Sequence, residues 1–73
     1  MRFLETRYQG FRLIACAQSG RDGLHAASVS IEKQGHRART FSDLDFFHAD
    51  ADALDYATTW GRIWIEANVP VRR

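Results

Sequence analysis

Apolar and polar residues alternate along three segments of the first 41 residues: RYQGFRLIACAQ (7–18), LHAASVSIEK (24–33) and HRARTF (36–41). A period of two is typical of β-strands with one buried face. The apolar positions predicted to face a core are Phe11, Leu13, Ala15, Ala17, Ala27, Val29 and Ile31. The sequence therefore predicts three strands.

Glycine-containing turns separate these segments. SGRDG (19–23) combines two glycines with Asp22, and these residue types accept the positive φ of hairpin loops. Gln34–Gly35 is a weaker relative of the Asn–Gly turn signal. We therefore expect the strands to form an antiparallel three-stranded β-meander.

The pattern changes to the 3.6-residue period of an α-helix at about Asp50. The apolar stripe predicted to face the core is Ala53, Tyr56, Ala57, Trp60, Ile63, Trp64 and Ala67. The opposite face is polar, and Asn68 followed by Pro70 is a helix-stop signal. The predicted fold class is α+β: a three-stranded meander packed on one C-terminal helix.

A chain of 73 residues has room for one core. We expect a single small domain over 1–73, with its core at about 7–68 and a flexible tail at 69–73. Cys16 is the only cysteine and so cannot form an internal disulfide, and no apolar run is long enough for a signal peptide or a membrane span. These features predict a cytoplasmic protein.

The charges are unevenly distributed along the chain. Residues 1–40 hold seven Lys/Arg and three Asp/Glu (+4), and residues 41–73 hold three and six (−3), which sum to the net charge of +1. Two interpretations remain open: the halves complement each other across the fold, or the basic half contacts a polyanion.

His48, Asp50 and Asp52 raise the question of a metal site. An EF-hand loop starting at Asp50 would require glycine at 55 and glutamate at 61, where the chain has Asp55 and Gly61. Aspartates at a helix start bind free backbone N–H groups and the positive end of the helix dipole. We therefore predict a helix cap, with no metal ligand and no cofactor.

A catalytic pair would consist of Cys16 as the nucleophile and one of the histidines as its base, within hydrogen-bond reach of the thiol. The candidate bases are His25, His36 and His48. Cys16 lies between alanines in a predicted strand, where a small buried side chain is the ordinary interpretation. GxSxG, HExxH, GxGxxG and Walker patterns are all missing from the sequence. We predict that the protein is not an enzyme.

Two surfaces are candidates for binding. Alternation places a basic cluster on or near one sheet face: Arg12, Lys33, Arg37 and Arg39. It is either a solvated face that resists aggregation or a phosphate-contacting surface. A second helical stripe either widens the core contact or binds a partner or a second copy: Leu54, Thr58, Gly61 and Ile65. Trp60 and Trp64 are predicted to anchor the core.

Several stretches carry a resemblance. YQGFRLIACA, VSIEKQG, FSDLDFF and ADALDYATTWGRIWIEA resemble short uncharacterised bacterial proteins of strand-strand-strand-helix order. FSDLDF followed by ADALDYA is similar to the end of HicB-type antitoxins, although Ser42 and Asp45 replace two prolines of that pattern. The predicted order also looks like that of integrase arm-binding and plant ethylene-response domains, in which arginines on a sheet enter the major groove of DNA.

These observations predict a small non-enzymatic binding module whose partner is a protein, or a second copy of the chain. The alternatives are a nucleic-acid-binding domain that uses the basic cluster and a HicB-like antitoxin. No membrane association is expected.

Overall fold

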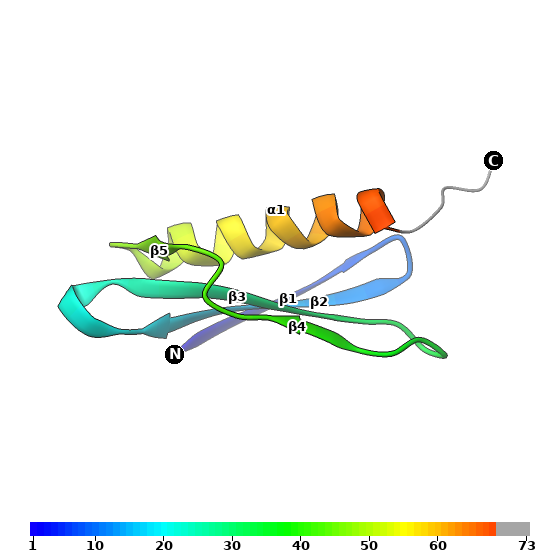
Figure 1. Cartoon of the computed structure of the whole chain (residues 1–73), viewed down its shortest axis with the longest axis horizontal. Helices are drawn as coiled ribbons and strands as arrows, with labels where there is room; N and C mark the ends of the chain where they lie inside the picture. Colours follow the sequence, from blue (N-terminus) through cyan, green and yellow to red (C-terminus); the bar gives the residue numbers. More distant parts are fainter. Residues whose placement is uncertain (69–73) are drawn as a thin grey trace.

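The computed structural model describes residues 1–68, which form one antiparallel sheet, one α-helix and a short 3-10 helix, η1 (Arg21–Gly23), between the second and third strands (Figure 1). The strands are β1 (Arg2–Tyr8), β2 (Phe11–Ser19), β3 (His25–Glu32), β4 (Arg39–Phe41) and β5 (Phe46–Phe47). The order in the sheet is β1-β2-β3-β4, and β5 also pairs with β3. Helix α1 (Asp50–Asn68) covers one face of the sheet. The expected tail, 69–73, lies outside the described residues.

The predicted α+β class is confirmed, since a meander packs on one C-terminal helix. The three expected strands correspond to β2, β3 and β4, and α1 spans the expected range. On β2, Phe11, Leu13, Ala15 and Ala17 are buried whereas the residues between them are only partly covered or exposed. The alternation in the sequence therefore identified the covered face of this strand correctly.

Strand β1 was not predicted, and the sheet begins before the expected start of the core at residue 7. Gln9 and Gly10 have φ of 51° and 83° and join β1 to β2 as a two-residue hairpin turn. Positive φ at both central positions is the geometry that favours glycine and small polar residues in such turns. The mixed polarity of RFLETRY hides its strand character, so the Gln9–Gly10 turn is its main sequence signal.

The far edge of the sheet is interrupted by FSDLDF. Between the pairs Val29–Phe41 and Ala26–Phe46 the edge chain contains two extra residues, and Asp43 has a φ of 53°. Ala27 bonds this segment through its own backbone: its oxygen accepts from the Leu44 N–H at 2.8 Å, and its N–H donates to the Asp45 oxygen at 2.9 Å. The segment is thus a bulge that divides one edge strand into β4 and β5.

The core lies between α1 and the covered face of the sheet, and many of its side chains are small. Alanines line the contact from both sides: Ala15, Ala17, Ala27, Ala53 and Ala57. A Cβ on Gly61 would lie 3.0 Å from Leu13 Cδ2 and 3.4 Å from Val29 Cγ2. Glycine at this position lets the helix approach the sheet more closely than a larger side chain would allow.

The stripe Leu54, Thr58, Gly61 and Ile65 is buried against the sheet. Of its two interpretations, the structure supports core contact, and the hypothesis that it is a partner surface is corrected: the close approach of the helix leaves these residues no exposed face. The Thr58 hydroxyl donates to the Leu54 backbone oxygen at 2.8 Å, so this buried hydroxyl has its hydrogen bond within the helix.

The core-facing side of the helix is rotated by roughly a quarter-turn from the predicted stripe. Ala53 and Ala57 are buried, but Tyr56 and Ile63 are 36% and 59% exposed. The predicted stripe was chosen by hydrophobicity, which favours large apolar residues, whereas the close contact between helix and sheet requires small ones. Within residues 1–68, no helix is both long enough and apolar enough to cross a membrane.

Trp60 and Trp64 pack at the margin of the core and are half-buried. Their ring centroids lie 4.8 Å and 5.6 Å from that of Phe41 on β4. Tilted rings at these separations contribute beyond simple burial. The pair therefore holds the edge strand β4 against the helix.

We expect Gly61→Val to lower the free energy of unfolding by about 2 kcal/mol, because its side chain must displace Leu13 and Val29. Gly61→Ala is the matched control: its gain in helix propensity, about 1 kcal/mol, offsets the tight contact of one methyl group. Urea denaturation of both variants checks the prediction. A valine variant as stable as wild type would show that the helix lies farther from the sheet.

Thr6 on β1 has a buried hydroxyl without a hydrogen-bond partner among the described residues. Thr6→Val removes that polar group and keeps the shape, so we expect stability to rise by about 1 kcal/mol. Thr58→Val should bring no such gain because its hydroxyl is already bonded. The same denaturation experiment compares the two, and a loss of stability in Thr6→Val would contradict the unsatisfied state of this hydroxyl.

Candidate binding surface at the basic end of the sheet

The antiparallel meander converts the charge asymmetry along the chain into one between its two ends. The β1–β2 turn, the β3–β4 loop and the C-terminal part of α1 lie together at one end (Figure 1). We call this the basic end; its cations are Arg7, Arg12, Lys33, Arg37, Arg39 and Arg62. The start of α1, β5 and the β2–β3 loop, which carry the aspartates, lie toward the opposite end. The molecule is elongated, with principal extents of 45 × 19 × 16 Å, so the two groups of charges are well separated.

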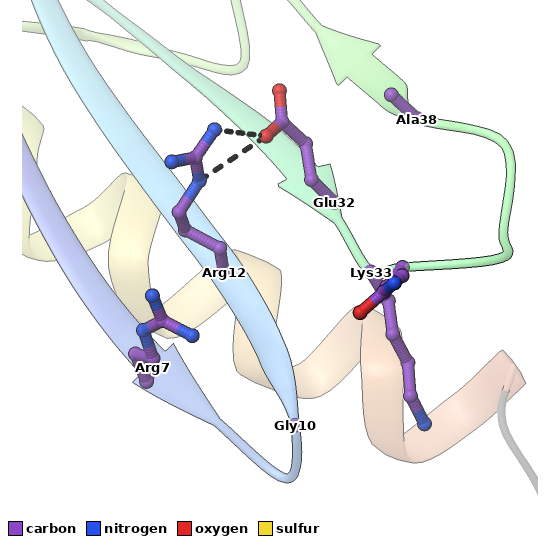
Figure 2. A pocket seen from close by; sticks show the side chains of 7 residues that line it. Arg7, Gly10, Arg12, Glu32, Lys33 and Ala38 are labelled. Atoms are coloured by element: carbon purple, nitrogen blue, oxygen red, sulfur yellow. Dashed lines mark hydrogen bonds and ion pairs between the residues drawn. The ribbon is translucent and has the colours of Figure 1, made fainter.

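The larger depression at this end has a volume of about 500 Å³ (Figure 2). Its walls come from β1, β2, the end of β3 and the chain that follows it, and they are lined by Arg7, Gly10, Arg12, Glu32, Lys33, Gln34 and Ala38. Figure 2 shows Arg7 and Arg12 on neighbouring strands, with Glu32 on the next strand bonded to Arg12. Three cations and one carboxylate give it a positive balance.

Arg12 is the most constrained of these cations. Its Nε and Nη2 donate to Glu32 Oε1 at 3.1 Å and 2.5 Å, and its Nη1 lies 3.8 Å from Glu5 Oε2. The hydrogen bond to Glu32, and then the charges of Glu32 and Glu5, raise the pKa of Arg12 above its ordinary value. Arg12 is therefore already partly neutralised.

Lys33 crosses the β1–β2 turn. Its Nζ lies 4.8 Å from the centroid of the Phe11 ring, a cation–π contact. A Cβ on Gly10 would lie 3.5 Å from Lys33 Cε, and φ at Gly10 is +83°. Gly10 thus supplies both the turn conformation and an open position beside the Lys33 stem.

A second depression, of about 240 Å³, lies between the β3–β4 loop and the end of α1. Its lining combines aromatic and basic residues: Phe11, Ile31, His36, Arg37, Arg39, Trp64 and Asn68. The Arg39 guanidinium carbon is 5.8 Å from the Trp64 ring centroid, and the His36 ring is 6.1 Å from Phe11. Positive charge and aromatic rings are therefore adjacent.

The predicted basic cluster shares one end of the sheet but not one face. Arg39 pairs with buried Ile31 and so lies on the helix-covered face, whereas Arg12 pairs with Glu32 on the uncovered face. Lys33 lines the larger depression and Arg37 the smaller. Arg12, Lys33, Arg37 and Arg39 therefore surround the end of the sheet.

Sequence reasoning missed Arg7 because it did not predict β1. Arg7 pairs with Arg12 across the β1–β2 ladder and lines the larger depression. Within residues 1–68 it makes no ion pair. The Gln9–Gly10 turn was the signal that would have placed it beside Arg12.

Cys16 is half-buried on the uncovered face, not within the core as predicted. Its register partners are Phe3 and Ser28, and no histidine pairs with it. On β3 its neighbours on this face are the small residues Ala26, Ser28 and Ser30, so the cysteine is only partly shielded.

Asp50, at the start of α1, makes a different contact from the expected cap. An Asp50 oxygen lies 3.0 Å from Arg2 Nη1, an exposed ion pair between the helix and β1. Within residues 1–68, no three His, Cys, Asp or Glu side chains gather closely enough to hold a metal ion.

Tyr8 connects β1 to the C-terminal part of α1 through a short hydrogen bond from its hydroxyl to Glu66. The Arg62 guanidinium carbon lies 5.7 Å from the Tyr8 ring centroid. The hydrogen bond to Glu66, then desolvation and the Glu66 charge, raise the pKa of Tyr8 above its ordinary value of 10.0.

Comparisons with models of known protein families, with curated proteins and with solved structures find no match for this chain.

We expect Glu66→Ala to lower the pKa of Tyr8, because the variant loses both the acceptor and the neighbouring charge. Since the folded-state pKa is raised, the stabilisation by Tyr8 is full below the unfolded pKa and is lost as pH rises through the folded pKa. As the pH rises from the unfolded-state pKa of Tyr8 through its folded-state pKa, the free energy of unfolding should therefore fall more in the wild type than in the variant. Ultraviolet titration and denaturation at alkaline pH measure both effects, and an unchanged Tyr8 pKa would contradict the contact.

Proposed function

We propose that the chain is a small non-enzymatic binding module, that the basic end is its contact surface, and that its partner is a single-stranded nucleic acid. The observation that carries the proposal is the pairing of two depressions around the β3–β4 loop. Between them they are lined by five cations, and the smaller one is also lined by the half-buried Trp64 and the exposed His36. Grooves with this combination suit phosphates and stacked bases.

Four of those cations are available for phosphate contact. Arg7, Lys33, Arg37 and Arg39 make no ion pair within residues 1–68, whereas Arg12 is bonded to Glu32. Lys33 and Arg39 lie over aromatic rings, but a cation–π contact leaves the charge able to attract an anion. Because Arg12 is already bonded to Glu32, we assign it a structural role in the wall of the larger depression and not a phosphate contact.

The arrangement of the cations on two faces favours a single strand over a duplex. Arg7 lies on the uncovered face and Arg39 on the covered face, with the β3–β4 loop between the two depressions. A rigid duplex approaching either face reaches only part of the set. A flexible single strand is able to follow the surface around the end of the sheet.

The net charge is compatible with a modest affinity. At +1 the whole chain attracts polyanions weakly, but six cations lie at the basic end, whereas Arg2 lies at the opposite end, paired with Asp50. Such an asymmetric charge distribution orients an approaching polyanion as well as attracting it. Within residues 1–68, the ion pair between Arg2 and Asp50 joins the two halves of the chain, and it lies away from the basic end.

We expect binding to a fluorescent single-stranded oligonucleotide with log K falling against log salt at a slope of about 3, from four cations at about 0.7 each. Arg7→Ala, Arg37→Ala and Arg39→Ala should each reduce the slope by about 0.7. Arg2→Ala is the matched control, because Arg2 is exposed at the opposite end and paired with Asp50. Fluorescence anisotropy at several salt concentrations provides the measurement.

A duplex of the same sequence should bind with a shallower slope. The proposal is overturned if the folded protein fails to bind either oligonucleotide at low salt, or if Arg2→Ala weakens binding as much as the other variants. Binding of poly-glutamate without binding of oligonucleotide would instead assign the basic end to an acidic protein.

A further inference from the structure

The two edges of the sheet differ in how they are protected. The β4–β5 edge consists of strands of three and two residues separated by the bulge around Asp43. Short strands and bulges prevent a sheet edge from pairing with another chain. Strand β1, in contrast, pairs with β2 over seven consecutive residues and has no strand on its outer side within residues 1–68.

The hairpin turn determines which backbone groups of β1 point outward. In a two-residue hairpin the residues that flank the turn, here Tyr8 and Phe11, exchange hydrogen bonds, and such pairs then alternate along the ladder. The N–H and C=O groups of Phe3, Glu5 and Arg7 therefore face away from β2. They form a regular row of donors and acceptors along the outer edge.

The side chains of β1 do not block this edge. The strand contains no proline, glycine, lysine or bulge. Phe3 and Leu4 are 64% and 43% exposed, so apolar area also remains uncovered. An edge of this length without prolines or bulges is a template for an added strand whose charges complement those of Glu5 and Arg7.

We propose that β1 pairs with β1 of a second copy, antiparallel and with Thr6 opposite Thr6 at the two-fold axis. This register places Glu5 of each copy directly opposite Arg7 of the other, twice by symmetry, and these are residues whose backbone groups face outward. Opposite charges at facing positions stabilise a sheet pair. It also places Leu4 opposite Tyr8 on the helix-covered face.

Neighbouring registers are less favourable. A shift that centres the axis on Glu5 gives the longest overlap but sets two carboxylates face to face, which is destabilising. A shift that centres it on Leu4 leaves Glu5 opposite Phe3. Of these three registers, only the one centred on Thr6 pairs Glu5 with Arg7. It also places Thr6 of the second copy beside Thr6, whose hydroxyl lacks a hydrogen-bond partner within residues 1–68.

A two-fold axis perpendicular to the sheet makes one continuous sheet with both helices on the same side. The pairing involves about five residues per strand, so it belongs with small interfaces that bury less than roughly 1,200 Å². We expect a dissociation constant between about 1 μM and 1 mM, measured by sedimentation equilibrium.

Charge reversals test the register in the full chain. Glu5→Arg sets arginines opposite each other and Arg7→Glu sets glutamates opposite each other, so each variant alone should dimerise about tenfold more weakly or worse. An equimolar mixture of the two should recover the wild-type mass, because every facing pair in the mixed dimer is again Arg–Glu. The double variant Glu5→Arg/Arg7→Glu should also recover it.

Glu5→Pro is a second, independent test. It removes an outward N–H, so the hairpin itself tolerates the change, as prolines do on exposed sheet edges. Circular dichroism should show a folded protein, and sedimentation should show a monomer. A wild type that stays monomeric up to about 1 mM, a dimer that persists in Glu5→Pro, or a mixture of single variants that fails to recover would each overturn the proposal.

Discussion

The structure depends on how closely α1 approaches the sheet at Gly61. Leu13 and Val29 occupy the space that a side chain at 61 would need, and the alanines Ala53 and Ala57 continue the contact toward the start of the helix. Close packing gains many dispersion contacts that are small individually and large in sum. The approach also fixes the rotation of the helix, and with it the positions of Trp64, Arg62 and Glu66 at the basic end.

This packing explains what could be predicted from the sequence and what could not. Alternation on β2 and β3 was sufficient to identify the covered face, because every second residue there is apolar. The helix was harder, because hydrophobicity favours Tyr56 and Ile63 over Gly61 and Thr58, whereas proximity to the sheet favours the small residues. Strand β1 has mixed polarity and lies at an edge, so its residues carry no burial pattern from which to predict it.

The candidate site shows the same division. The sequence identified Arg12, Lys33, Arg37 and Arg39 as a basic cluster. The pairing of β3 with β4 then shows that Arg39 and Arg12 lie on opposite faces of the sheet. Arg7 joins the group through the hairpin at Gln9–Gly10, and Trp64 through the helix. The charge pattern along the chain therefore predicts which end of the meander is basic. The pairing register of the strands determines which of these cations lie on the same face of the sheet.

The proposed contact surface makes a specific claim about where a nucleic acid touches the protein. The most direct measurement is amide chemical-shift mapping by ¹⁵N–¹H correlation spectra during titration with a single-stranded oligonucleotide at low salt. Binding at the basic end predicts shifts confined to the β1–β2 turn, the β3–β4 loop and the last turns of the helix near Trp64. Shifts centred on the acidic start of the helix, or on its exposed face at Tyr56 and Ile63, would contradict it.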